Sequence, residues 1–179
     1  MKDSLARVTS PGYLSGLTAL PMEQVRAMRA ECQGLENALS YVRRVAQGRL
    51  DIVGAELARR RAGGDPADLS DLIGRLPDIL ADRTQSSGNP NARPPLDFAG
   101  DASGEEYSAE VDAIFGPADT GALTTLDDAH LDDVRERLAQ YEQLTSARRR
   151  GLHDLIDQLQ AEITRRYRTG EATVDSLLR

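Results

Sequence analysis

Apolar residues recur in alternating steps of three and four along two long stretches of the chain. The first stretch contains Val25, Met28, Cys32, Leu35, Leu39, Val42 and Ala46. The second contains Leu131, Val134, Leu138, Tyr141, Leu152, Leu155, Leu159 and Ile163. This spacing is typical of the a/d seam of a coiled coil, so it predicts one helix from about Met22 to Arg61 and another from about Asp127 to Arg168.

The remaining segments show weaker patterns. Residues 68–82 carry enough leucine and isoleucine for a short amphipathic helix, which Pro77 should interrupt or bend. Residues 84–125 are rich in Ser, Gly, Asn, Pro and acidic residues and are expected to form a flexible linker, in which 107–115 would order transiently or on binding. The N-terminal 21 residues are also expected to be flexible, and 170–179 are expected to form a C-terminal tail.

The predicted fold is all-α. Two long helices, spanning about 22–63 and 126–169, should form an antiparallel coiled-coil hairpin, with the short extra helix at 64–83 and the linker between them. The chain of 179 residues has only 4% aromatic residues and no Trp, which suits a thin helical architecture better than a thick core.

A shift of 106 positions aligns the chain with itself, and polar residues coincide in the two copies. Both copies read Glu-x3-Ser-x2-Arg-x3-(Gln or His)-x3-Asp. The first motif stripe comprises Glu36, Ser40, Arg43, Gln47 and Asp51. The second motif stripe comprises Glu142, Ser146, Arg149, His153 and Asp157. Downstream, Glu56 with Arg59-Arg60 aligns with Glu162 and Arg165-Arg166. The repeat indicates a duplicated helix.

Spacings of three and four place each motif stripe on one side of its helix, next to the apolar seam. Such flanking residues often form ordinary salt bridges at coiled-coil e and g positions. Charge pairing alone, however, has no need for a serine and a final aspartate in both copies, since both are mediocre helix formers with short side chains. A bound ligand accounts for them better.

The composition argues against several classes of protein. The single Cys32 excludes an internal disulfide or a multi-cysteine metal site, and no apolar run is long enough to span a bilayer, so we expect a cytoplasmic protein without a membrane anchor. Only two histidines, His130 and His153, are present, and no nucleophile motif, phosphate-binding glycine loop or metal-ligand spacing occurs, so an enzyme is not expected.

The repeated motif resembles that of the RsiG family, the cyclic di-GMP-dependent anti-sigma factors of sporulating actinobacteria, whose signature is Glu-x3-Ser-x2-Arg-x3-Gln-x3-Asp on two antiparallel helices. The first motif stripe matches at every position, and the second departs only at His153, where the family has Gln. Histidine can donate and accept hydrogen bonds as Gln does, and it would add pH sensitivity.

The resemblance implies a regulatory ligand and a partner. Members of that family bind an intercalated dimer of cyclic di-GMP and, once loaded, hold the sporulation sigma factor WhiG away from RNA polymerase. Arginine suits guanine O6/N7 or phosphate, carboxylates suit the guanine Watson–Crick edge, and serine suits phosphate. Arg44 and Arg150 are repeated too, outside the family pattern, and their guanidinium planes could stack on guanine or remain in solvent. No other cofactor or metal is expected.

Two other readings remain open. The chain could be a coiled-coil adaptor or scaffold that binds no nucleotide, in which case the repeat reflects helix duplication alone. The arginine clusters at 43–44, 148–150 and 165–166 could also indicate a DNA-reading helix. The net charge of −7 and the acidic residues between the clusters argue against direct DNA binding.

Overall fold

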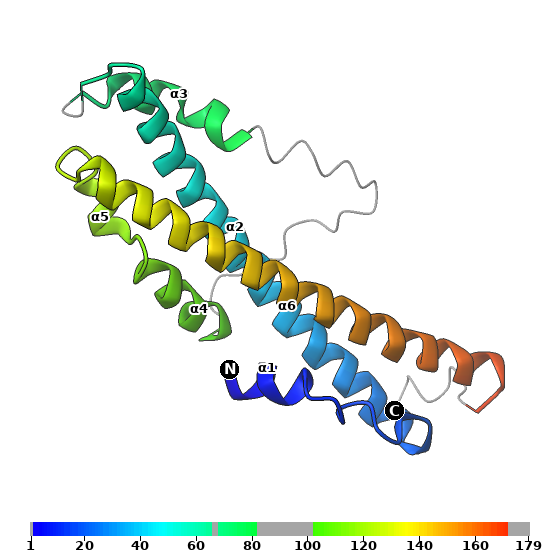
Figure 1. Cartoon of the computed structure of the whole chain (residues 1–179). Coiled ribbons are helices and arrows are strands. Elements are labelled where there is room, and N and C mark those ends of the chain that lie inside the picture. Colours follow the sequence, from blue (N-terminus) through cyan, green and yellow to red (C-terminus); the bar gives the residue numbers. More distant parts are fainter. Residues whose placement is uncertain (1, 66–67, 82–101, 172–179) are drawn as a thin grey trace. The chain divides into compact units, whose positions relative to one another are not determined.

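The computed structural model describes residues 2–65, 68–81 and 102–171. In these residues the chain forms helices and turns and no strand, which confirms the all-α fold (Figure 1). The elements are α1 (Lys2–Val8), the 3-10 turn η1 (Leu17–Ala19), α2 (Met22–Arg61), α3 (Ser70–Ala81), α4 (Ala102–Asp112), α5 (Pro117–Gly121) and α6 (Asp128–Arg168). No helix within the described ranges is both long and apolar enough to cross a bilayer.

The two long helices are α2 and α6, as the seam predicts. Most of their seam residues are buried, because a three-four spacing turns one side of each helix toward its partner. The buried seam comprises Val25, Cys32, Leu35, Leu39, Val42, Ala46, Val53 and Leu57 in α2, and Leu131, Val134, Leu138, Leu152, Leu159 and Ile163 in α6. The chain divides into two compact units, each of which takes one part of α2 and one part of α6.

The first unit contains Met1–Ser40 and Ser146–Arg179. Here the N-terminal part of α2 pairs with the C-terminal part of α6, and α1 adds the buried side chains of Leu5 and Val8. Polar contacts join Arg26 to Tyr167 and Glu36 to Arg149, so residue numbers fall along one helix as they rise along the other. The pair is therefore antiparallel.

The second unit contains Tyr41–Thr145. The C-terminal part of α2 pairs with the N-terminal part of α6, again antiparallel, since Arg43 bonds to Glu142 and Arg61 bonds to Asp132. The apolar side chains of Tyr107, Val111 and Phe115, at the end of α4 and just after it, are fully buried in this unit.

Two segments expected to be flexible contain ordered helices instead. Residues 1–21 contain α1 and η1, and Leu5 and Val8, three positions apart on one side of α1, are both buried. The expected linker lies outside the described residues up to position 101, and the helices α4 and α5 lie within 102–125. The sequence suggested otherwise because Gly, Ser, Thr and acidic residues separate the few buried apolar residues.

Helix α3 agrees with the predicted amphipathic segment and begins two residues later. Asp68 Oδ1 accepts a hydrogen bond of 2.9 Å from the Ser70 backbone N–H at its start. Pro77 lies inside α3, yet the helix continues to Ala81, so the proline does not interrupt it. Leu72 is buried whereas Ile73 is 61% exposed, so α3 leaves apolar surface uncovered by the described residues.

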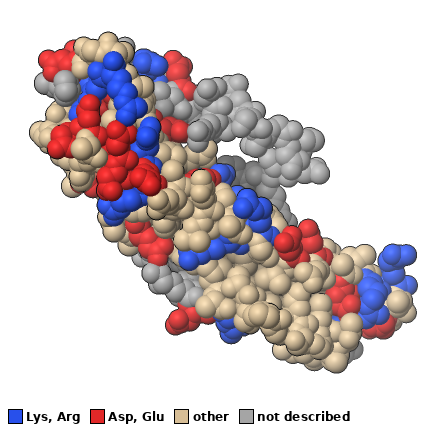
Figure 2. Space-filling model, viewed as in Figure 1, with Lys and Arg blue, Asp and Glu red and all other residues tan. Residues whose placement is uncertain are grey.

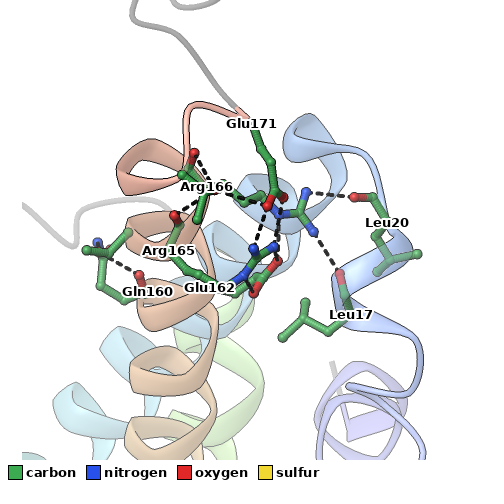
Figure 3. Close-up of polar contacts among 9 residues, drawn as sticks. Leu17, Leu20, Gln160, Glu162, Arg165, Arg166 and Glu171 are labelled. Atoms are coloured by element: carbon green, nitrogen blue, oxygen red, sulfur yellow. Dashed lines mark hydrogen bonds and ion pairs between the residues drawn. The ribbon is translucent and has the colours of Figure 1, made fainter.

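Each long helix ends with a buried arginine that holds the chain entering the other helix. In the first unit, Arg166 donates 2.7 and 2.8 Å hydrogen bonds to the carbonyls of Leu20 and Leu17, just before α2 (Figure 3). In the second unit, Arg60 donates 2.7 and 2.8 Å hydrogen bonds to the carbonyls of Leu126 and Leu123, just before α6. All three pairs of positions, 17/123, 20/126 and 60/166, differ by the repeat shift. The duplication therefore includes these arginine clamps.

Candidate ligand-binding site

The two motif stripes are divided between the units. The first unit holds six motif residues, which are Glu36, Ser40, Ser146, Arg149, His153 and Asp157. The second unit holds the other four, which are Arg43, Gln47, Asp51 and Glu142. Each unit thus combines residues from both copies of the repeat.

In the first unit, Glu36 is the centre of a polar network. Arg149 donates to Glu36 Oε1 from Nε at 3.1 Å and from Nη2 at 2.9 Å. Ser40 Oγ donates to the same oxygen at 2.7 Å, and His153 Nε2 lies 3.3 Å from it. Gln33 Nε2 donates to the other oxygen at 3.4 Å. Four motif residues from both copies therefore meet at one carboxylate.

The carboxylate of Glu36 stays ionised although it is only 6% exposed. Burial raises the pKa of Glu36, but hydrogen bonds from Ser40 and Arg149 and the positive charge of Arg149 outweigh that effect. As a result, the pKa of Glu36 lies below its usual value. The network therefore keeps a charged acceptor and a charged donor side by side in a partly buried place.

In the second unit, Arg43 makes the corresponding contact. Its Nη1 donates to Glu142 Oε1 at 3.2 Å and to Gln47 Oε1 at 3.3 Å. Both charged side chains are about one quarter exposed, at 26% for Arg43 and 24% for Glu142. The Arg43 Nε atom is buried and has no hydrogen-bond partner among the described residues. A buried donor without a partner costs free energy, so this guanidinium is less fully bonded than that of Arg149.

The two arginine–glutamate pairs are equivalent under the repeat. Positions 36 and 142 differ by the same shift as positions 43 and 149, so each pair joins the glutamate of one motif stripe to the arginine of the other. Ordinary salt bridges within one helix would not produce this exchange. Within each unit, the two motif stripes therefore face each other.

The remaining motif residues differ in exposure. Ser146 and Asp51 are half-buried and each has a polar partner. Asp157 is exposed and lies, with Gln160, Thr164 and Arg168, beside a surface cavity of about 730 Å³ in the first unit. Arg44 and Arg150, the repeated arginines outside the family pattern, are both exposed. The structure therefore leaves Asp157, Arg44 and Arg150 accessible.

The short helices α1 and α4 bond to α2 at residues that lie on the side away from the motif stripes. In the first unit, Arg7 of α1 pairs with Glu31, which lies nine positions, or 2.5 helical turns, before Ser40. In the second unit, Arg49 bonds to Asp112 of α4 and, at 2.7 Å, to the Phe115 carbonyl, and Arg49 lies about 200° around α2 from Gln47. Neither covering helix contacts the motif side through these bonds.

Sequence reasoning missed two features of this region. Gln33, which donates to Glu36, has no polar equivalent in the second copy, where Ala139 stands, so the repeat could not identify it. The repeated Glu-x2-Arg-Arg segments were visible in the alignment, but their role as clamps depends on which carbonyls the folded chain brings near. In the second unit, burial raises the pKa of Glu56, but hydrogen bonds from Arg59 and Arg60 give a net lowering.

The charged surface of the second unit is mixed. Figure 2 shows acidic and basic side chains side by side over the end of α2 and the start of α6. Asp132 pairs with both Arg61 and Arg135, and Asp133 pairs with Arg137 at 3.5 Å. A continuous basic face, which DNA binding would need, is not formed there. In the described part of the chain, no group of three or more His, Cys, Asp or Glu side chains could hold a metal ion.

Comparison with known proteins gives one match. The model of the family described as RsiG-like matches residues 11–80 and 117–179, which include both motif stripes and both clamps. The unmatched stretch includes α4. No curated protein matches the chain.

Proposed function

The chain belongs to the RsiG-like family, a membership that indicates an anti-sigma factor role, and we propose that cyclic di-GMP controls this role through the two motif stripes. Loaded with the nucleotide, the protein would sequester a sporulation sigma factor of the WhiG type from RNA polymerase. The family is regulatory, and the proposal involves no catalysis.

One observation carries the proposal. The arginine of each motif stripe bonds to the glutamate of the other, in the first unit through Glu36 and Arg149 and in the second through Arg43 and Glu142. A ligand of two guanines and two phosphates needs strong donors next to strong acceptors, and it needs them twice. The duplicated arginine–glutamate pairs provide that arrangement.

The residue types fit the chemistry of the nucleotide. Arg43 and Arg149 would donate to guanine O6/N7 or to phosphate oxygens, as arginine commonly does. Carboxylates would accept hydrogen bonds from guanine N1–H and the exocyclic amine, and the exposed Asp157 is the most accessible of them. Ser40 and Ser146 would bind phosphate, and Gln47 and His153 would complete the polar lining.

Both arginines retain donors for a ligand while they are bound to glutamate. Arg149 uses Nε and Nη2 on Glu36, which leaves Nη1 without a partner among the described residues. Arg43 uses Nη1 on Glu142 and Gln47, which leaves Nη2 without a partner among the described residues. The glutamates would thus orient each guanidinium in advance, and less side-chain entropy would be lost when the nucleotide binds.

Ligand control follows from linkage. A nucleotide that binds the paired helices but not the separated ones stabilises the pair by RT ln(1 + [L]/Kd), about 2.7 kcal/mol at a hundredfold excess over Kd. A partner that recognises the paired helices then binds more tightly, because a larger fraction of the protein molecules has its helices paired. The nucleotide would therefore hold the two long helices together.

Titration of the purified chain with a WhiG-type sigma factor tests the proposal, with and without cyclic di-GMP. We expect tight binding only when the nucleotide is present. Arg43→Ala plus Arg149→Ala should abolish the effect of the nucleotide. The matched control is Arg135→Ala plus Arg137→Ala, which removes two exposed arginines of α6 outside the motif stripes and should leave the effect intact.

The same titration distinguishes a nucleotide-controlled anti-sigma factor from an adaptor that needs no nucleotide. A scaffold that needs no nucleotide would bind the sigma factor equally well with and without cyclic di-GMP, and the double arginine variant would bind it as the wild type does. That result would overturn the control by nucleotide while leaving the family assignment in place.

A further inference from the structure

The middle of α6 lacks the features that stabilise the rest of the helix. Residues 145–151, called here the central segment of α6, contain Thr145 and Arg148 at seam positions and Gly151 one turn later. The equivalent positions of α2 are Leu39, Val42 and Val45. At the two seam positions of this segment, α6 therefore carries polar residues where α2 carries apolar ones.

Thr145 is a poor seam residue. It is fully buried, as Leu39 is, but its hydroxyl has no hydrogen-bond partner among the described residues. A buried hydroxyl without a partner loses its bonds to water and gains none in return. Leu138 and Leu152, seam residues before and after this segment, are fully buried and apolar, and Tyr141, between Leu138 and Thr145, is half-buried. The unsatisfied hydroxyl thus lies in the central segment.

Arg148 and Gly151 weaken the same segment. Arg148 is half-buried at a seam position and has no ion pair in the described ranges, and it stands before two further arginines. Gly151 is exposed within the helix, and a side-chain carbon at this position would meet nothing within 4 Å. No close approach requires glycine there, and glycine lowers the helical stability of any segment that contains it.

Two of the motif residues, Ser146 and Arg149, lie inside the central segment. We propose that the central segment of α6 is a built-in weak point that opens in the free protein and that cyclic di-GMP orders, so that the folding of this segment couples the nucleotide to partner binding. The inference rests on the proposed function, because the ligand is the one proposed above. The inference adds that the ligand acts by ordering residues 145–151 of α6.

Local opening occurs where buried apolar contacts are few, and its free energy sets how often the backbone amides exchange. A ligand held by Ser146 and Arg149 would supply contacts that the seam lacks. If the seam were apolar throughout, the helices would pair without help, and a ligand could add little to their competence for the partner.

Hydrogen–deuterium exchange of the full chain, with and without cyclic di-GMP, tests the inference. In the free protein we expect amides of 145–152 to exchange about tenfold or more faster than amides of 134–141 and 156–163. Cyclic di-GMP should slow the central segment about tenfold or more and change the flanks less.

Two variants sharpen the test. Thr145→Val removes the hydroxyl with little change of shape, and Gly151→Ala raises helix propensity at an exposed position, so together they should slow exchange without ligand and reduce the further effect of cyclic di-GMP. Gly34→Ala is the control, since Gly34 of α2 also has open space around it and lies outside the segment. It should leave 145–152 unchanged.

The outcomes are distinguishable. Uniform protection along α6 in the free protein, or a ligand effect that the two substitutions do not reduce, would overturn the inference and leave the proposed function standing. A chain that does not bind cyclic di-GMP at all by calorimetry would overturn the proposed function, and the coupling with it.

Discussion

Arg149 donates hydrogen bonds from both Nε and Nη2 to Oε1 of Glu36, at 3.1 and 2.9 Å, and so joins the second motif stripe to the first. The corresponding bond in the second unit joins Arg43 to Glu142 at 3.2 Å. The two contacts share residue types and repeat positions but differ in burial, since Glu36 is nearly buried and Glu142 is about one quarter exposed. Substitution of Glu36 should therefore weaken ligand binding more than substitution of Glu142.

Glu36→Gln should lower the affinity for cyclic di-GMP about tenfold or more. The neutral amide cannot hold the Arg149 guanidinium as firmly, and a hydrogen bond to a charged group contributes about 1.5–3 kcal/mol. Calorimetric titration measures the change. Glu136→Gln, at an exposed position of α6, is the control and should bind as the wild type does. Equal affinity of both variants would argue against the ordering role of Glu36.

The stability of the free protein should fall as the solution becomes acidic, partly through Glu36. Its pKa in the folded protein is below the usual value, so the stabilisation is fully present above the unfolded value of about 4.3 and is lost as pH falls through the folded pKa. Urea unfolding at several pH values measures this slope. Glu36→Gln should flatten the slope between about pH 5 and 3, and an unchanged slope would contradict the assignment.

Arg166→Ala should destabilise the first unit more than Arg168→Ala does. The Arg166 guanidinium is buried and holds Glu162 and the carbonyls of Leu17 and Leu20, whereas Arg168 is exposed (Figure 3). We expect the melting temperature to fall by about 5 °C or more and amides near the start of α2 to exchange faster. Similar melting of both variants would show that the clamp contributes little.

The stability that the Arg166 clamp gives to the first unit should also depend on pH. Hydrogen bonds from Arg165 and Arg166 lower the pKa of Glu162 to about 2, so this carboxylate remains charged after most others are protonated. Its contribution to stability is present above the unfolded pKa and is lost only as pH falls toward 2. The start of α2 should therefore stay protected at pH 3, and its early loss would contradict the assignment.

Phe115→Ala should destabilise the protein by about 3–5 kcal/mol, because it removes a fully buried aromatic side chain after α4. Denaturant unfolding measures the change. Leu144→Ala, at a position that is 49% exposed, should cost less than about 1 kcal/mol. A small effect at Phe115 would restore the flexible linker that the sequence suggested for this stretch.

These predictions separate what the sequence could reveal from what it could not. The three-four spacing of residues such as Leu39 and Leu138 placed both long helices within a residue or two, because periodicity depends only on local geometry. The repeat identified which polar residues belong together. The partners within the network, such as Arg149 for Glu36, needed the register of the two helices, which packing along their whole length determines.

Helices α1 and α4 were missed for a related reason. Each is short and carries few apolar residues, and short helices gain most of their stability from tertiary packing rather than from their own propensity. Tyr107 and Val111 of α4 became recognisable as core residues only in the folded second unit. The same limit applies to Arg60 and Arg166, whose carbonyl partners lie more than sixty positions away in the sequence.

Isothermal titration of cyclic di-GMP into the full chain tests the central claim most directly. The wild type and the Arg135→Ala plus Arg137→Ala control should bind with the stoichiometry of a nucleotide dimer per chain, and Arg43→Ala plus Arg149→Ala should not bind measurably. Absence of binding by the wild type, or undiminished binding by the Arg43/Arg149 variant, would contradict a nucleotide site formed by the motif stripes.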